Sequence, residues 1–161
     1  MEIKFKQLHP NAKLPLRGSD GAAGYDLYAA DYTWCGGLNL FYTGLAVEIP
    51  EGYFGAIYPR SSGCFQPYRM YGTMVIDSDF RGEIIIPFYD PDVVFDHPAF
   101  EAKRIKWLDS KGKKPSLAGR YSLGDRIAQL VVQPCVNFEP VWAETLSETA
   151  RGTGGYGSTG R

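Results

Sequence analysis

The apolar residues of this chain fall in short segments rich in β-branched and aromatic side chains. Examples are "YFGAIYP" (53–59), "GEIIIPFY" (82–89) and "DRIAQLVVQPCVNF" (125–138). No long stretch has the 3.6-residue period of an amphipathic helix, and 19 Gly and 11 Pro interrupt the chain. Short strands separated by turn residues are typical of sandwiches and barrels. The sequence therefore predicts an all-β domain with at most one short helix, at about residues 63 to 71.

Length and charge narrow the classes of protein further. The 161 residues, 44% of them hydrophobic, suffice for one domain with a full core. The net charge of −1 gives no general attraction to nucleic acid or acidic membranes. The sequence has no run of 18 apolar residues, and "MEIKFKQLHP" (1–10) lacks an apolar stretch behind its charges. We therefore expect no membrane span, no signal peptide and a cytoplasmic location.

Cysteine and histidine are too few and too scattered for the commonest metal and nucleophile sites. The three cysteines lie far apart without a CxxC motif, so we expect reduced thiols and neither a disulfide framework nor a metal-ligand cluster. The two histidines have no local partner that suggests a catalytic triad or an HExxH zinc site. A hydrolase built on this chain would depend on carboxylates, arginines and a bound metal.

The chain ends on "RGTGGYGSTGR" (151–161), in which five residues are Gly. Ordering a backbone costs roughly 1–2 kcal/mol per residue, and this segment has little apolar surface to bury in return. Arg, Ser, Thr and bare backbone N–H groups are suited to phosphate oxygens. The segment is either a disordered tail or an arm that a phosphate-rich ligand orders.

A second unusual segment is "EAKRIKWLDSKGKKP" (101–115), with six basic residues against two acids. A run of this kind is usually a solvated loop, and the alternative is a contact with nucleic acid or protein.

Four further motifs place polar groups among strand-like residues. They are "AAGYDLYAA" (22–30), "PRSSG" (59–63), "VIDSDFRGEI" (75–84), which predicts a β-hairpin, and "GDRIAQL" (124–130). Each polar group also has a purely structural interpretation. Asp26 would be a turn residue, Arg60 half of a surface ion pair, Gln129 a satisfied strand polar group, and Asp77 a cap of the hairpin.

In this order, and followed by the Gly-rich end, the motifs resemble the trimeric dUTPase family. The resemblance covers nearly the whole chain except about residues 91–121, where some bacteriophage members carry an insertion. It implies a jelly-roll-type β-barrel (1–150), a C-terminal arm (151–161) that closes over the active site, and a homotrimer with shared active sites. It also implies Mg²⁺-dependent hydrolysis of dUTP to dUMP and pyrophosphate, which keeps uracil out of DNA and supplies dUMP for dTMP synthesis.

The resemblance gives individual residues roles. Asp77 matches the carboxylate that orients and deprotonates the water attacking the α-phosphorus, in a reaction where positioning dominates. Asp26 matches the acid that holds magnesium through its water shell. The substrate contacts implied by the second and fourth motifs are Arg60, Ser61, Ser62, Gly63 and Gln129.

The third motif and the tail imply the rest of the substrate site. Val75 and Ile76 border the uracil pocket, and Phe80 stands where the family usually has a Tyr ring against the deoxyribose. In the tail, Arg151 would grip the γ-phosphate, and Tyr156 stands where the family usually has a Phe stacked on uracil. The remaining expected tail contacts are Gly157, Ser158 and Thr159.

Two alternatives belong beside this interpretation. A dCTP deaminase shares the fold and an "RSS" motif, but its general-base Glu would fall roughly at Pro87, which cannot take a proton. The other is a regulatory role through a protein partner of the 91–121 insertion, added to catalysis or, in an idle jelly roll, replacing it.

Overall fold

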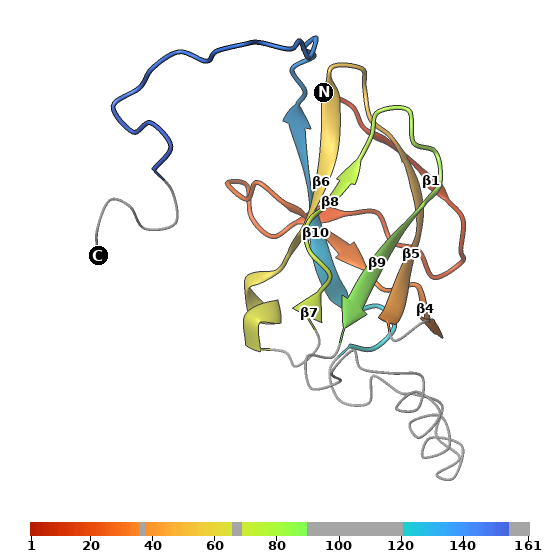
Figure 1. The fold of residues 1–161 in the computed structure, drawn as a ribbon. Coiled ribbons are helices and arrows are strands. Elements are labelled where there is room, and N and C mark those ends of the chain that lie inside the picture. Colours follow the sequence, from red (N-terminus) through yellow and green to blue (C-terminus); the bar gives the residue numbers. More distant parts are fainter. Residues whose placement is uncertain (36–37, 66–68, 90–120, 155–161) are drawn as a thin grey trace.

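Two antiparallel sheets lie face to face with apolar side chains between them (Figure 1). The computed structural model describes residues 1–35, 38–65, 69–89 and 121–154. In the first sheet the strand order is β1-β5-β9-β7, and β4 also pairs with β5. Its strands are β1 (Lys4–Gln7), β4 (Asp31–Cys35), β5 (Leu38–Glu48), β7 (Arg69–Met70) and β9 (Glu83–Tyr89).

The second sheet carries most of the motifs that the sequence analysis singled out. Its strand order is β2-β3-β10-β6-β8, so β10 lies at the centre. The strands are β2 (Leu16–Arg17), β3 (Tyr25–Tyr28), β6 (Tyr53–Pro59), β8 (Met74–Ile76) and β10 (Arg126–Pro134). The all-β, jelly-roll-type fold expected from the sequence is confirmed.

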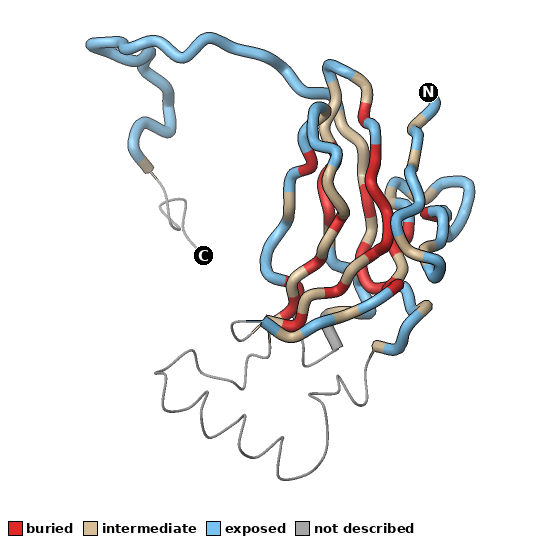
Figure 2. The backbone as a smooth tube through the Cα atoms, turned by 90° about the vertical axis from the view of Figure 1, so that its right-hand side faces the viewer, coloured by how far each residue is buried: buried red, intermediate tan, exposed pale blue. Residues whose placement is uncertain are grey.

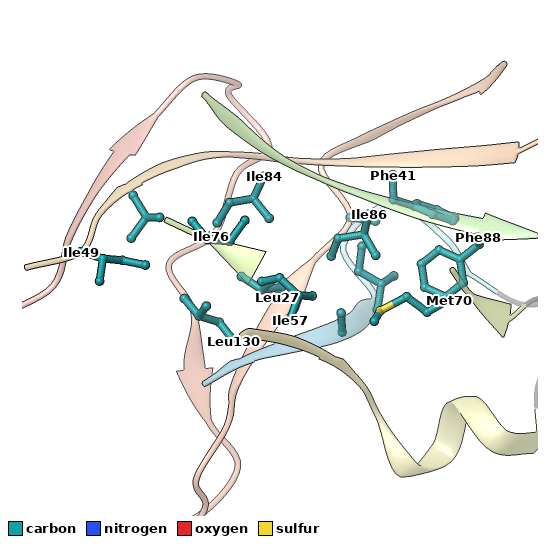
Figure 3. Packing of buried hydrophobic residues seen from close by; sticks show 14 residues of the cluster. Leu27, Phe41, Ile49, Ile57, Met70, Ile76, Ile84, Ile86, Phe88 and Leu130 are labelled. Atoms are coloured by element: carbon teal, nitrogen blue, oxygen red, sulfur yellow. The ribbon is translucent and has the colours of Figure 1, made fainter. Parts of the chain in front are cut away.

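The core follows from the alternation of side chains along the strands. In β9, Ile84, Ile86 and Phe88 are buried while the residues between them are partly exposed. They meet Leu27 and Ile57 of the opposite sheet (Figure 3). Alternate residues of a strand point to opposite faces, so β9 gives one face to this core and leaves the other partly exposed.

The predicted helix is shorter and begins earlier than expected. A 3-10 helix, η1, spans Ser61–Phe65, and residues 69–70 form β7 instead of continuing it. The helix follows β6 at once, with the Gly63 amide donating to the Arg60 carbonyl at 2.8 Å. No helix in the described part of the chain is long and apolar enough to span a bilayer.

The prediction of a hairpin at residues 75–84 is wrong. β8 pairs with β6 in the second sheet, whereas β9 pairs with β5 and β7 in the first. The segment between them carries the chain across from one sheet to the other. Ile76 and Ile84, on either side of this segment, both lie in the core between the sheets. β8 and β9 therefore bury these side chains from two facing sheets and do not pair with each other.

The chain leaves the sheets after β10. Residues 135–150 form neither strand nor helix, and Figure 2 shows them extending away from the buried core as an exposed segment. Five large apolar side chains of this segment, which we call the apolar arm, are 78% or more exposed: Val136, Phe138, Val141, Trp142 and Leu146.

Candidate functional site

Asp26 and Gln129 face each other across the central strands of the second sheet. In the pairing of β3 with β10, Gln129 is the direct partner of Asp26. On the other side of β10, Gln129 is paired with Tyr58 of β6, and its Nε2 donates to the Pro59 carbonyl at 3.1 Å. Three motifs that are distant in the sequence therefore meet at one end of the sheet.

Two arginines hold the Asp26 carboxylate. Arg60 Nε lies 3.0 Å from Asp26 Oδ1, and Arg126 Nη1 lies 3.2 Å from Oδ2. Arg60 Nη1 also donates to the backbone carbonyl of Arg126 at 3.2 Å. We call Asp26, Arg60 and Arg126 the arginine–aspartate cluster. A carboxylate that is only 9% exposed needs such partners, because burying an unpaired charge is costly.

The start of η1 continues this site. Ser61 and Ser62 are exposed and follow Arg60 directly. Beside them, a Cβ placed on Gly63 would lie 3.7 Å from the hydroxyl of Tyr121. The Tyr121 ring packs on Phe88 with centroids 5.5 Å apart, and burial raises the pKa of its hydroxyl against the opposing charge of Arg60. A cation and two hydroxyls therefore follow the end of β6, and the Gln129 amide of β10 lies beside them.

Gly24 makes room for Gln129. A Cβ on Gly24 would overlap the Gln129 side chain, with Cδ only 3.0 Å away. Sequence reasoning missed this role, although a glycine just before a strand is a known sign of close approach.

Asp77 lies at the other end of β6. Gly55 pairs with Ile76, so Asp77 comes opposite the start of β6, whereas Arg60 follows its end. A strand rises about 3.3 Å per residue, which places Asp77 and Arg60 of one chain roughly 20 Å apart. The structure therefore does not bring the predicted base to the predicted phosphate contacts within a single subunit.

The segment 77–82, which we call the Asp77 turn, is tightly held. The Phe80 amide donates to the Asp77 carbonyl at 3.1 Å. Arg81 Nη1 donates to the carbonyls of Ser78 at 2.7 Å and of Phe80 at 2.8 Å. These contacts leave the Asp77 side chain exposed. The role of Arg81 was not foreseen, because no sequence pattern marks a side chain that caps its own turn.

Phe80 lies over Gly82. The ring atom Cζ is 2.5 Å from where a Cβ of Gly82 would be, so only glycine leaves space for the ring. Phe80 remains 40% exposed and Val75 62% exposed, whereas Ile76 is buried at 5%. Phe80 and Val75 therefore border an open surface, and Ile76 could offer a ligand only its backbone.

The described part of the tail, residues 151–154, lies away from the arginine–aspartate cluster and from the Asp77 turn. Arg151 is exposed, and its Nε donates to the Gly154 carbonyl at 2.8 Å. It follows the apolar arm, which Figure 1 shows away from the sheets. The predicted contacts Tyr156, Gly157, Ser158 and Thr159 lie outside the described residues, as does the predicted insertion from residue 91 through 120.

Among the described carboxylates, Asp26 is the one suited to a metal ion held through water. In the part of the chain that the structure describes, no three His, Cys, Asp or Glu side chains gather to hold an ion. Asp26 Oδ2 accepts a hydrogen bond from Arg126, and Oδ1 forms an ion pair with Arg60. Because a carboxylate oxygen accepts about two hydrogen bonds, Asp26 can also accept a hydrogen bond from a metal-bound water. It suits outer contact with Mg²⁺, which keeps several waters.

Comparison with known proteins links these features. The family model described as dUTPase matches residues 10–93 and 119–160, and thus leaves out most of the predicted insertion. The mitochondrial deoxyuridine 5'-triphosphate nucleotidohydrolase of Dictyostelium discoideum is 37% identical over 160 residues, covering 98% of this chain and 76% of its own. The human mitochondrial enzyme of the same name is 34% identical over 163 residues, covering 100% and 56%.

Solved structures give the same result. The Staphylococcus bacteriophage 80alpha dUTPase G164S mutant with dUpNHpp superposes with a TM-score of 0.72 at 26% identity, covering 99% of both chains. A dUTPase from phage phi11 of S. aureus, described as showing a species-specific insert, has a TM-score of 0.67 at 24% identity and supports the fold. It covers 92% of this chain and 100% of its own.

Proposed function

This chain belongs to the dUTPase family, and on that premise we propose that it hydrolyses dUTP to dUMP and pyrophosphate at sites shared between subunits. The observation that carries the proposal is the meeting of Asp26, Arg60 and Gln129 at one end of the second sheet. These groups come from three of the family's motifs and supply the charge and hydrogen bonds that a triphosphate requires.

Asp77 acts as the general base. It takes a proton from a water whose oxygen forms a bond to the α-phosphorus, while the bond from that phosphorus to the bridging oxygen breaks and pyrophosphate leaves. Positioning and charge neutralisation supply most of the catalysis in such a transfer. The hydrogen bonds of Phe80 and Arg81 within the Asp77 turn support this role, because they hold the backbone that carries the carboxylate.

Mg²⁺ would be bound mainly by the triphosphate, with Asp26 accepting a hydrogen bond from one of its waters. When bound, the ion neutralises phosphate charge. Arg60 and Gln129 bind phosphate oxygens directly, and the exposed hydroxyls of Ser61 and Ser62 add donors beside them.

Uracil is recognised along β8. This strand is the last of the second sheet, so the backbone groups on its outer edge are not used in the pairing of the described strands. Such groups can pair with a base edge, and they reject cytosine because its donor and acceptor are reversed at position 4. The Phe80 ring over Gly82 forms the wall that excludes a 2′-hydroxyl.

The separation of Asp77 from Arg60 supports a shared site. Roughly 20 Å of β6 lies between them, so one subunit supplies the Asp77 turn and a second supplies the arginine–aspartate cluster and Gln129. The Gly-rich tail comes from the third subunit of a homotrimer and closes over the bound nucleotide. Arg151 then meets the γ-phosphate, and Tyr156 stacks on uracil.

The apolar arm supports assembly independently. Its five exposed side chains are not covered by the described residues of their own chain, and a groove of about 420 Å³ lined by Ile3, Phe5 and Val132, among others, lies on the two-sheet body. Exposed apolar surface of this kind is typical of protein interfaces. The apolar arm of a neighbouring subunit would bind in this groove.

The decisive experiment incubates the purified chain with Mg²⁺ and either dUTP or dCTP, and measures pyrophosphate and ammonia. We expect pyrophosphate from dUTP alone. The Asp77→Asn variant should fold and bind dUTP but turn over at least ~10²-fold more slowly, the scale of a lost general base. Ammonia from dCTP would favour the deaminase alternative, and near-normal turnover by Asp77→Asn would remove Asp77 from this role.

Regulation through a protein partner of the 91–121 insertion stays a prediction, as does a cytoplasmic location. Pull-downs from host lysate with and without residues 101–120 test the first of these. Identical sets of captured proteins would exclude the role.

A further inference from the structure

β10 is irregular at the point where it meets the arginine–aspartate cluster. Gln129 pairs with Asp26 and Ala128 with Leu27, but Arg126 pairs with Tyr28, so the register shifts between Arg126 and Ala128. Ile127 is the additional residue on β10. A strand with two residues opposite one on its partner contains a β-bulge.

The bulge decides which way Arg126 faces. Leu130 and Ala128 are buried in the core, and in a regular strand Arg126 would lie on the same face as these two. Instead Ile127 and Ala128 are both buried in succession, at 1% and 0% exposure. Arg126 is therefore on the outer face, together with Gln129, and reaches Asp26.

From this position Arg126 contacts both other members of the cluster. Its guanidinium binds Asp26 Oδ2 at 3.2 Å, and its backbone carbonyl accepts from Arg60 Nη1 at 3.2 Å. Arg60 thus contacts Asp26 through Nε and the Arg126 carbonyl through Nη1. Its third nitrogen, Nη2, has no partner among the described residues and remains for a ligand.

We propose that Arg126 is a positioning residue of the phosphate site: turned outward by the bulge at Ile127, it holds the Asp26 carboxylate and so orients the Arg60 guanidinium toward a substrate phosphate. The proposal rests on the proposed function for its substrate. One arginine would leave the second oxygen of Asp26 unpaired, and the carboxylate could rotate away from Arg60 Nε. Two arginines, one on each oxygen, fix its plane.

A double-mutant cycle tests the proposal. Arg126→Gln, Arg60→Gln and the double variant are assayed for dUTP hydrolysis, together with melting temperature. We expect each single change to lower kcat/KM by about tenfold or more, and the double variant to be no worse than Arg60→Gln within about twofold, since residues that act as one unit are non-additive. Losses that multiply would mean that Arg126 contacts substrate by itself, and would overturn the proposal.

Arg17→Gln is the matched control. Arg17 is also an arginine of the second sheet, on β2, but its Nε donates to the Ala22 carbonyl at 3.0 Å and takes no part in the cluster. This change should leave kcat and KM unaltered. Arg126→Lys retains a charge near Asp26 and should recover part of the loss. A folded Arg126→Gln variant with wild-type kcat/KM would exclude the positioning role.

A readout without substrate separates this inference from the proposed function. In ¹⁵N NMR spectra of the unliganded protein, the Arg60 Nε–H should give a sharp, slowly exchanging signal that broadens or shifts in Arg126→Gln but not in Arg17→Gln. Failure of the wild type to hydrolyse dUTP would overturn the proposed function and leave this result standing. An unchanged Arg60 signal in Arg126→Gln would overturn the positioning role alone.

Discussion

Beside Gly24 and beside Gly82, a side chain of the proposed substrate site occupies the space that a Cβ would need. Gly24 adjoins Gln129, and Gly82 lies under the ring of Phe80. Neither glycine has a positive φ. Both positions therefore require glycine because a larger side chain would not fit, and not because of the backbone conformation. Alanine at either position adds a methyl group without backbone strain, so its effect reports on the displaced neighbour.

Gly24→Ala should displace Gln129 and weaken its phosphate contact. We expect kcat/KM for dUTP to fall by about tenfold, comparable to one lost hydrogen bond to a charged group, with little change in melting temperature. Gly21→Ala is the matched control because a Cβ there would meet nothing within 4 Å. Equal activities of the two variants would show that the position of Gln129 is not critical.

Gly82→Ala should push the Phe80 ring aside and open the wall against ribose. The expected result is a lower ratio of kcat/KM for dUTP over UTP, approached also by Phe80→Ala, whereas Phe80→Tyr should keep the ratio. Steady-state kinetics with both nucleotides measures it. Unchanged discrimination in Gly82→Ala would assign ribose exclusion to another group.

At the scale of the elements, the Gly-rich tail is proposed to act without contributing to the core. Deleting residues 151–161 should leave the melting temperature nearly unchanged, because a segment with five Gly in eleven residues has little apolar surface to bury. Turnover should fall by orders of magnitude, since the closed tail excludes water and adds positive charge at the phosphates.

Arg151→Ala should reproduce a good part of that loss. Calorimetry measures the melting temperature of each variant, and pyrophosphate release measures its turnover. A truncated enzyme with the full-length rate would show that the tail has no catalytic part.

The sequence predicts the elements better than it predicts their partners. The segments 53–59 and 82–89 form β6 and β9 nearly as predicted, because short runs of β-branched and aromatic residues between turn residues are a local signal. The hairpin at 75–84 was wrong because strand pairing is decided by which sheet buries Ile76 and Ile84. The link between Asp26 and Arg126 was not foreseen, since it joins residues 100 positions apart and depends on a bulge.

In the assembled protein, two strongly impaired variants should complement each other. Asp77→Asn lacks the base, and Arg60→Gln lacks the phosphate contact while keeping a donor toward Asp26. When both are unfolded, mixed in equal amounts and refolded, about a quarter of the sites in a random trimer receive Asp77 and Arg60 from intact positions on two subunits.

The mixture should therefore recover about a quarter of wild-type activity, while each variant refolded alone keeps about a tenth or less. Light scattering must show trimers in all three samples. An inactive mixture of well-formed trimers would place the whole site within one subunit.

The length of β6 has a consequence for freshly made enzyme. This strand keeps the proposed base and the proposed phosphate contacts at opposite ends, so we expect a lone chain not to hydrolyse dUTP even when it is fully folded. Specific activity should then rise steeply with protein concentration at high dilution and level off once assembly is complete. In a cell that begins to make this protein, dUTP hydrolysis should be almost absent at the first low copy numbers. It should then rise sharply as the copy number becomes high enough for trimers to form.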